Sequence, residues 1–238
     1  MPRDLILSSG FLAFARHIGV LMEVERPEID AVVGTSSGAL VGALWAAGHS
    51  PETICDWIAE RRPMSLIGLH LRPWRGALSL RPLEAFLRER LPARFDELQH
   101  PLAVGVIDHK GDHLLLKRGD LPSAVTASCA MPMVFHPVEV DGHLYQDGGA
   151  ADRLALGPWR QWRPGREAIA HRVQRTAGKD LADVLDDVTL VETPRSGASF
   201  LSLGDVRGQV AEAKRIAAQG LANSSLADSA LADSALAD

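Results

Sequence analysis

The segment IDAVVGTSSGALVGALWAAG, residues 29–48, carries the strongest structural signal in the chain. A short β-branched run is followed at once by glycines and then by a helix-forming run, which predicts a strand, a tight turn and a helix. Ser36 lies at the apex of this turn, with Gly34 and Gly38 two residues away on either side. This GxSxG spacing is typical of a nucleophile elbow, in which side chains at the two glycine positions would collide.

The same turn has two other interpretations. Glycines and serines form ordinary turns that cap helices, and a glycine-rich loop at a helix N-terminus also binds phosphate. A nucleophilic serine, however, needs an exposed hydroxyl above the positive end of a helix dipole, and a strand-turn-helix places it there. The context therefore favours a nucleophile at Ser36.

Composition indicates one globular domain, expected over residues 1–222. Of the 238 residues, 46% are hydrophobic and 23% are charged, as in ordinary globular proteins. The formal net charge is -5, which offers nothing to attract nucleic acid. Residues 223–238 repeat a five-residue unit that matches no helical period, and we expect them to form a low-complexity, disordered tail.

The cysteines and the apolar segments favour a reducing compartment. Cys55 and Cys129 show no CxxC spacing and lie in segments expected to be buried, so we expect no disulfide. No apolar run approaches the roughly 20 residues that span a bilayer. The apolar N-terminal segment is interrupted by charge and lacks a cleavage site for a signal peptidase. We therefore expect a cytoplasmic protein.

The order of the expected elements predicts an α/β fold. Strands are expected at residues 4–7 and 29–33, each followed by a helix, at residues 11–24 and from the elbow to residue 48. This alternation is typical of a mostly parallel sheet with helices on its faces. Further strands are expected at residues 101–108, 113–117, 137–140, 143–146, 168–173 and 188–191, and further helices at residues 50–61, 82–91, 121–130 and 204–221.

Two connecting segments are less regular. Residues 63–80 are apolar, broken by glycine and free of acidic residues, which fits either a lipid-facing flap with Arg72, Trp74 and Arg75 or a connector packed on the core. Residues 159–165, with two tryptophans, are expected to form a loop.

A serine hydroxyl becomes a nucleophile only when a base takes its proton. In the common hydrolase order an acid and then a histidine follow the serine, and the only histidine after Asp147 is His171. His171 lies in an expected strand among charged residues, so a Ser-His-Asp triad is an available but unattractive arrangement. His17 is interpreted as a core histidine. Asp147 precedes two glycines and by itself is more typical of a turn residue than of a base.

Three separated blocks together resemble the bacterial patatin-like phospholipases. They are SSGFLAFARHIGVL (residues 8–21), GTSSGALVGALWAAG (34–48) and ASCAMPMVFHPVEVDGHLYQDGG (127–149). The resemblance covers residues 4 to about 155 and implies a three-layer α/β/α fold with a mostly parallel central sheet. It implies a lipid acyl hydrolase that uses a serine–aspartate dyad, with Ser36 as nucleophile and Asp147 as base.

The resemblance also implies roles for four further residues. Gly10 and Phe11 would supply the backbone N–H donors of an oxyanion hole. Gly148 and Gly149 would let the main chain turn tightly so that Asp147 reaches the serine. The substrate implied is a lipid or another ester, with transient contact to a membrane surface and with no metal or cofactor.

One block departs from the family pattern. Its members usually carry three consecutive glycines and a basic residue in the first block, where this chain has Phe11, Leu12 and Phe14. An uncharged loop suits a neutral ester better than a phosphate head group. The departure also leaves open a different class of protein, a fold relative that binds lipid or a protein partner without turnover.

Overall fold

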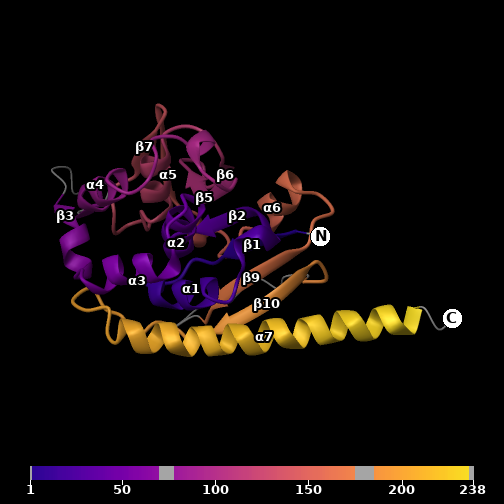
Figure 1. Cartoon of the computed structure of the whole chain (residues 1–238). Coiled ribbons are helices and arrows are strands. Elements are labelled where there is room, and N and C mark those ends of the chain that lie inside the picture. The colour runs from indigo at the N-terminus through magenta and orange to yellow at the C-terminus, as the bar shows by residue number, and fades with distance from the viewer. Residues whose placement is uncertain (1, 70–77, 175–184, 236–238) are drawn as a thin grey trace.

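The computed structural model describes residues 2–69, 78–174 and 185–235 (Figure 1). Strands and helices alternate along the chain, as the sequence predicts. The elements are β1 (Arg3–Leu7), α1 (Phe14–Leu21), β2 (Ile29–Thr35), α2 (Ser37–Ala46), α3 (Pro51–Ala59), β3 (Gly68–Leu69), β4 (Leu78–Ser79), α4 (Arg81–Arg88), β5 (Leu102–Asp108), β6 (His113–Leu116), α5 (Leu121–Ser128), β7 (Val138–Val140), β8 (His143–Asp147), α6 (Leu156–Trp162), β9 (Ala168–Val173), β10 (Val188–Thr193) and α7 (Val206–Ala235).

The central sheet of the described chain has the strand order β10-β9-β1-β2-β5-β8-β7, with β6 also paired to β5. The pairs from β10 to β5 are parallel, and the pairs that β5 makes with β6 and β8 are antiparallel. Parallel strands need crossover connections, and the helices after β1 and β2 provide them. The expected mostly parallel sheet is therefore confirmed.

Both faces of the sheet are buried, which is why its parallel strands are almost continuously apolar. On one face Leu5, Leu7 and Val32 pack with residues of α1, α2, α3 and α7. On the other face Ile6 and Val33 pack with Leu154, Leu156 and Trp159, the last two from α6. The fold is thus a three-layer α/β/α arrangement, and Figure 1 shows α7 lying along the outer strands while α6 covers the opposite side.

Three parts of the chain differ most from the sequence expectation. Helix α1 begins at Phe14 rather than at residue 11, since a turn at residues 11–12 precedes it. The loop expected at residues 159–165 is wrong for its first half, where α6 forms. Its first turn is stabilised because the Asp152 carboxylate accepts the N–H groups of Leu154 and Leu156, and because the Trp159 indole is fully buried and donates to Asp4 at 2.9 Å.

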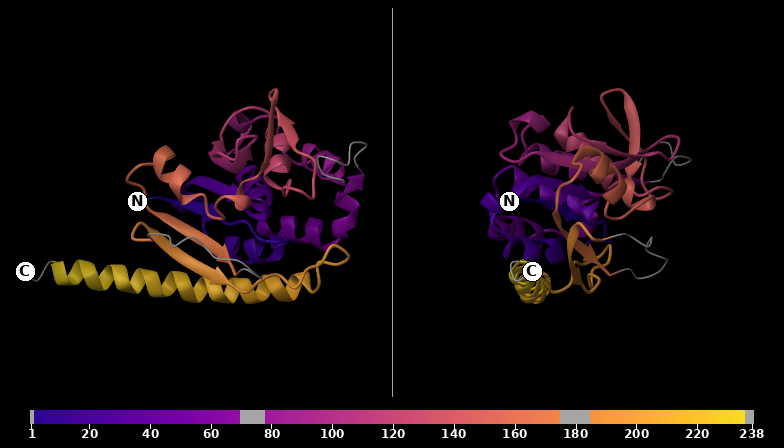
Figure 2. Two further views of the ribbon diagram at one scale, coloured as in Figure 1. Left: turned by 180° about the vertical axis from the view of Figure 1, so that it is seen from behind. Right: turned by 90° about the vertical axis from the view of Figure 1, so that its right-hand side faces the viewer.

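The third difference lies at the C-terminus. Helix α7 continues to Ala235 and extends past the sheet, where the sequence predicted a tail without structure from residue 223 (Figure 2). Alanine and leucine, which recur in the repeat, are strong helix formers and keep this backbone helical although its period matches no helix. Residues 70–77, which include Arg72, Trp74 and Arg75 of the predicted flap, lie outside the described residues.

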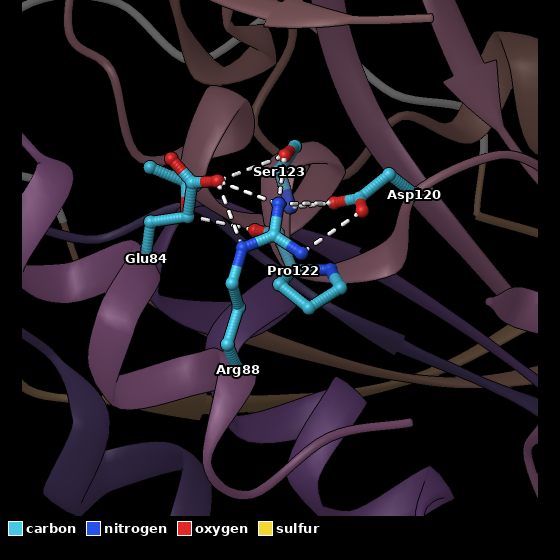
Figure 3. A network of polar contacts seen from close by, with 6 residues as sticks. Glu84, Arg88, Asp120, Pro122 and Ser123 are labelled. Atoms are coloured by element: carbon cyan, nitrogen blue, oxygen red, sulfur yellow. Dashed lines mark hydrogen bonds and ion pairs between the residues drawn. The ribbon is translucent and has the colours of Figure 1, made fainter. Parts of the chain in front are cut away.

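A polar cluster joins α4 to the start of α5 (Figure 3). Arg88 donates to both carboxylate oxygens of Asp120, at 3.0 and 2.9 Å, and to Glu84 at 2.7 Å. Asp120 also accepts the N–H of Ser123 and so caps α5. A two-pronged arginine–carboxylate pair fixes orientation as well as distance. The cluster therefore sets the position of α5, whose last residue supports the elbow described below.

We expect Gly19→Ala to destabilise the fold because α1 and α7 are in close backbone contact there. A Cβ at Gly19 would lie 2.4 Å from the Val210 carbonyl oxygen and 2.9 Å from the Lys214 nitrogen, so the helices would have to separate. The loss should exceed about 2 kcal/mol, measured by urea unfolding. Gly157→Ala is the matched control, since a Cβ on this α6 residue meets nothing within 4 Å. Equal stability of the two variants would contradict this packing argument.

Candidate active site

Ser36 occupies a strained backbone position at the junction of β2 and α2. Its φ of 55° and ψ of -119° lie in a region that costs an L-residue about 1–3 kcal/mol. The flanking glycines make this turn sterically possible. A Cβ at Gly34 would lie 2.6 Å from the Ala39 Cα, and one at Gly38 would lie 2.3 Å from the Leu7 carbonyl oxygen. The predicted steric need for glycine at both positions is thus confirmed.

Helix α5 holds the elbow from the side. The Ser36 N–H donates to the Ser128 Oγ at 2.8 Å, and that hydroxyl donates in turn to the Gly105 carbonyl at 2.6 Å. The Cys129 thiol donates to the Ser36 carbonyl at 3.4 Å. Sequence reasoning did not assign a role to Ser128, although its alanine-serine context belongs to the third block. Burial raises the pKa of the Cys129 thiol, and Asp147 adds to the shift, so this thiol stays protonated.

Asp147 reaches the same place along the edge of β5 that β2 also uses, because β6 occupies the opposite edge. In the sheet register Thr35 pairs with Gly105, and Asp147 pairs with the next residue, Val106. The ends of β2 and β8 therefore meet at consecutive positions along one edge of β5. A Cβ at Gly148 would lie 2.7 Å from the Gly105 backbone, so only glycine lets the chain turn here.

The Asp147 carboxyl lines the same cavity as Ser36, whose side chain lowers the pKa of the carboxyl. The Asp147 Oδ1 accepts the Gly149 N–H at 2.8 Å. Burial raises the pKa of Asp147 to about 6, against the opposing effects of the Ser36 side chain and the Gly149 N–H. The carboxyl is therefore mostly ionised at neutral pH but titrates close to it.

The loop after β1 offers free backbone donors. Within the part of the chain that the structure describes, the N–H groups of Gly10 and Phe11 have no hydrogen-bond acceptor. Leu12 has a φ of 47°, in the left-handed region that favours glycine. Arg153 braces the loop, because its guanidinium donates to the carbonyls of Ser9 and Val173. No sequence pattern pointed to this arginine.

These groups line one cavity of roughly 790 Å³, within the usual range for small-ligand sites. Ser36, Asp147, Gly10 and Phe11 all contribute to its wall. Most of the remaining lining is apolar and comes from several elements: Phe14, Leu66, Leu80, Leu83, Met131 and Phe135. The Phe14 ring belongs to the core, and the Phe11 ring packs edge-to-face on Phe200, with centroids 5.0 Å apart.

A buried histidine pair lies behind the elbow. The Nδ1 atoms of His17 and His171 are 2.8 Å apart, so one donates and the other accepts. His17 Nε2 is 3.2 Å from the Ser37 Oγ, and His171 Nε2 is 2.9 Å from the Thr193 Oγ1. His17 is a core histidine, as predicted. Among the described contacts, none joins His171 to Ser36 or Asp147, so the triad alternative gains no support.

Burial keeps both imidazoles neutral. It lowers the pKa of His17 to about 3, with a smaller contribution from Arg153. It also lowers the pKa of His171, and His17 and Arg16 act in the same direction. Neutral rings can hold one donor and one acceptor each, which the four-membered chain from Ser37 to Thr193 requires.

The sequence and the fold both have known relatives. Residues 5–158, well over half of the chain, match the family described as patatin-like phospholipase. The chain therefore belongs to the patatin-like phospholipase family, which confirms the resemblance seen in the three sequence blocks.

Individual relatives match over the same part. An uncharacterized NTE family protein of Mycobacterium tuberculosis is 34% identical over 161 residues, which are 65% of this chain and 44% of that protein. The neuropathy target esterase sws of Drosophila persimilis is 30% identical over 163 residues, 63% of this chain and 11% of the relative. The chain thus spans less than half the length of these curated relatives.

Two solved structures have the same fold. VipD from Legionella pneumophila matches with a TM-score of 0.58 at 14% identity, covering 94% of this chain and 67% of VipD. The type III effector protein ExoU matches with a TM-score of 0.55 at 15% identity, covering 93% of this chain and 53% of ExoU. At this level of identity the likeness establishes the fold alone.

The described residues contain neither a candidate metal site nor a candidate membrane-spanning helix. Over residues 2–69, 78–174 and 185–235, no group of three or more histidine, cysteine, aspartate or glutamate side chains is placed to hold a metal ion. Over the same ranges, no helix has the length and apolarity needed to cross a membrane.

We expect the histidine pair to make the fold acid-sensitive. The unfolded chain takes up protons at its histidines near pH 6.5, whereas the folded pair does not, so the pair's contribution to stability is complete above pH 6.5 and is lost as pH falls toward 3. Asp147 acts oppositely, since below about pH 6 the folded state binds its proton first. With two histidines against one carboxyl, the free energy of unfolding should fall between pH 6.5 and 5.

His171→Gln should reduce this fall by about 1.4 kcal/mol per pH unit. Urea unfolding at pH 7, 6 and 5 measures it, with exposed His143→Gln as the control. If His171→Gln lost as much stability as the wild-type chain, the pair would not be the cause. Imidazole ¹⁵N resonances of the wild-type chain give an independent check, because those of His17 and His171 should not titrate above pH 5.

Proposed function

We propose that this chain is a serine esterase that hydrolyses carboxylic ester bonds of lipids through Ser36 and Asp147. The observation that carries the proposal is that Ser36, on its strained elbow, and the buried Asp147 carboxyl line the wall of one mostly apolar cavity, where the Ser36 side chain acts on the pKa of that carboxyl. Family membership supports a lipid hydrolase in general, and the name of the Drosophila relative identifies that protein as an esterase.

The proposed reaction begins with attack of the Ser36 Oγ on the ester carbonyl carbon, while Asp147 accepts the hydroxyl proton. The carbonyl oxygen becomes an oxyanion, and the free N–H groups of Gly10 and Phe11 stabilise it. Collapse of the tetrahedral state breaks the ester C–O bond, and the leaving alcohol takes the proton from Asp147. The acyl group remains on Ser36.

The second half of the cycle repeats the same proton transfers with water. Asp147 accepts a proton from water, the resulting hydroxide attacks the acyl-serine, and Ser36 leaves with that proton as the carboxylic acid forms. A carboxylate with a pKa of about 6 is suited to this task, because it is ionised at pH 7 yet basic enough to hold the proton transiently.

The apolar lining fits the acyl chain of the substrate. Phe14, Leu66 and Leu83 belong to three different elements or connections and would enclose a hydrocarbon chain next to the serine. The cavity is large enough for one such chain, with a volume of roughly 790 Å³.

A fluorophosphonate probe tests the nucleophile. We expect it to label the wild-type chain and to leave Ser36→Ala unlabelled, because only an activated serine reacts. Ser37→Ala is the matched control, since this neighbouring hydroxyl contacts His17 and not Asp147. An unlabelled wild-type chain would favour the second class of function, a fold relative that binds lipid or a partner without turnover. If labelling were lost in Ser37→Ala and kept in Ser36→Ala, the nucleophile would be Ser37, and the proposal for Ser36 would be wrong.

The base is tested by the pH dependence of hydrolysis. The value of kcat/KM for a soluble ester should rise with pH through about 6 and then level off, because Asp147 acts only when ionised. Asp147→Asn keeps the shape of the side chain but cannot accept the proton, so its kcat/KM should fall by roughly 100-fold or more. A variant with unchanged rate and a circular dichroism spectrum like that of the wild-type chain would refute the dyad.

A further inference from the structure

The exposed apolar side chains of the described residues are concentrated around one site. Of the seven large hydrophobic residues that are exposed, six lie in segments that also line the cavity. We call these six the apolar rim: Phe11, Met64, Leu69, Met133, Phe200 and Leu201. The seventh, Leu114, lies on β6. Monomeric proteins seldom gather such residues in one place, so the clustering requires a cause.

Contacts join the rim segments in two pairs around the cavity. The rings of Phe11 and Phe200 meet edge-to-face, and the Ser196 hydroxyl donates to the Phe11 carbonyl at 2.6 Å. In the second pair, Leu78 of β4, the strand paired with β3, exchanges backbone hydrogen bonds with Val134 and His136. Figure 1 and the left view of Figure 2 show the molecule from front and back. In both, β3 and the loop before α7 lie at the end of the molecule opposite the C-terminus.

Met133 shows that this exposure is built into the backbone. Its side chain is 95% exposed, and its φ of 68° lies in the left-handed region, which is unfavourable for methionine. The turn that presents it is held by hydrogen bonds from Val134 and Phe135 to the Met131 carbonyl. Neither the strain nor the exposure improves stability in water, so the residue fits a surface that meets an apolar medium.

The charges around the rim have one sign. The four rim segments, residues 9–14, 61–69, 129–136 and 195–203, contain three arginines and no aspartate or glutamate, although the whole chain has a net charge of -5. Arg62 and Arg195 are exposed, and within the described chain neither has a carboxylate partner. An apolar surface that carries arginines and no carboxylates attracts anionic lipid head groups, even though the protein as a whole is acidic.

We propose that the apolar rim docks on the surface of an anionic phospholipid bilayer, with Met133, Leu69 and Leu201 inserted among the lipids. This deepens the proposed function, because docking brings the cavity mouth to the membrane from which a lipid ester would enter. The interaction itself is independent of turnover, since none of these three side chains lines the cavity.

Vesicle sedimentation tests the docking. The wild-type chain and Ser36→Ala should both sediment with phosphatidylglycerol vesicles, and at least 10-fold less with phosphatidylcholine vesicles. The double variant Met133→Ser/Leu201→Ser should lose at least 10-fold in vesicle affinity. Leu114→Ser, which removes an exposed leucine outside the rim, is the matched control and should bind as the wild-type chain does.

Each other outcome overturns the proposal. These are failure of the wild-type chain to bind anionic vesicles, unchanged binding by the double variant, or equal binding to both lipids. Elution of the wild-type chain as a dimer that the double variant converts to a monomer would assign the rim to a second copy instead. Fluorophosphonate labelling of the double variant separates the two proposals, because loss of docking with labelling intact concerns the rim alone, whereas absent labelling with docking intact refutes the esterase alone.

Discussion

The close approach of α2 to the end of β1 is the contact on which the elbow depends. With the Leu7 carbonyl where a Cβ of residue 38 would lie, only glycine lets the helix start directly over the sheet. Every residue of α2 is buried, so the helix cannot shift away to relax the turn. The strain at Ser36, about 1–3 kcal/mol, is therefore maintained by the packing of a whole layer.

Three other elements reach Ser36 because their ends lie at the same edge of the sheet. Helix α5 supplies Ser128, β8 supplies Asp147, and the loop after β1 supplies free N–H groups. All act in a site that excludes much of the solvent, where a hydrogen bond or a fixed dipole counts for more than it does in water. The same exclusion raises the pKa of Asp147 and holds the histidine pair neutral.

The floor and the mouth of the cavity differ in polarity. The floor of the cavity holds buried polar groups whose partners come from distant parts of the chain, such as Arg153 beneath the loop at Ser9. The mouth carries exposed apolar side chains together with Arg62 and Arg195, which have no carboxylate partner among the described residues. The entrance is therefore apolar, and the environment of Ser36 is polar and preorganised. An ester substrate with a hydrocarbon chain would pass the apolar entrance first and reach the polar groups at the serine afterwards.

The sequence by itself determined what depends on neighbours along the chain. Glycines two residues on either side of Ser36 predicted the elbow, and strand-helix alternation predicted the parallel sheet, because tight turns and apolar periodicity are local properties. The three blocks also indicated Asp147 before any geometry was known. Only the tertiary structure decided the rest: that His171 pairs with His17, that the Trp159 indole of α6 is buried against Asp4, and that Met133 and Phe200 share one rim. Each of these placements joins residues tens to more than a hundred positions apart, which no local pattern along the chain encodes.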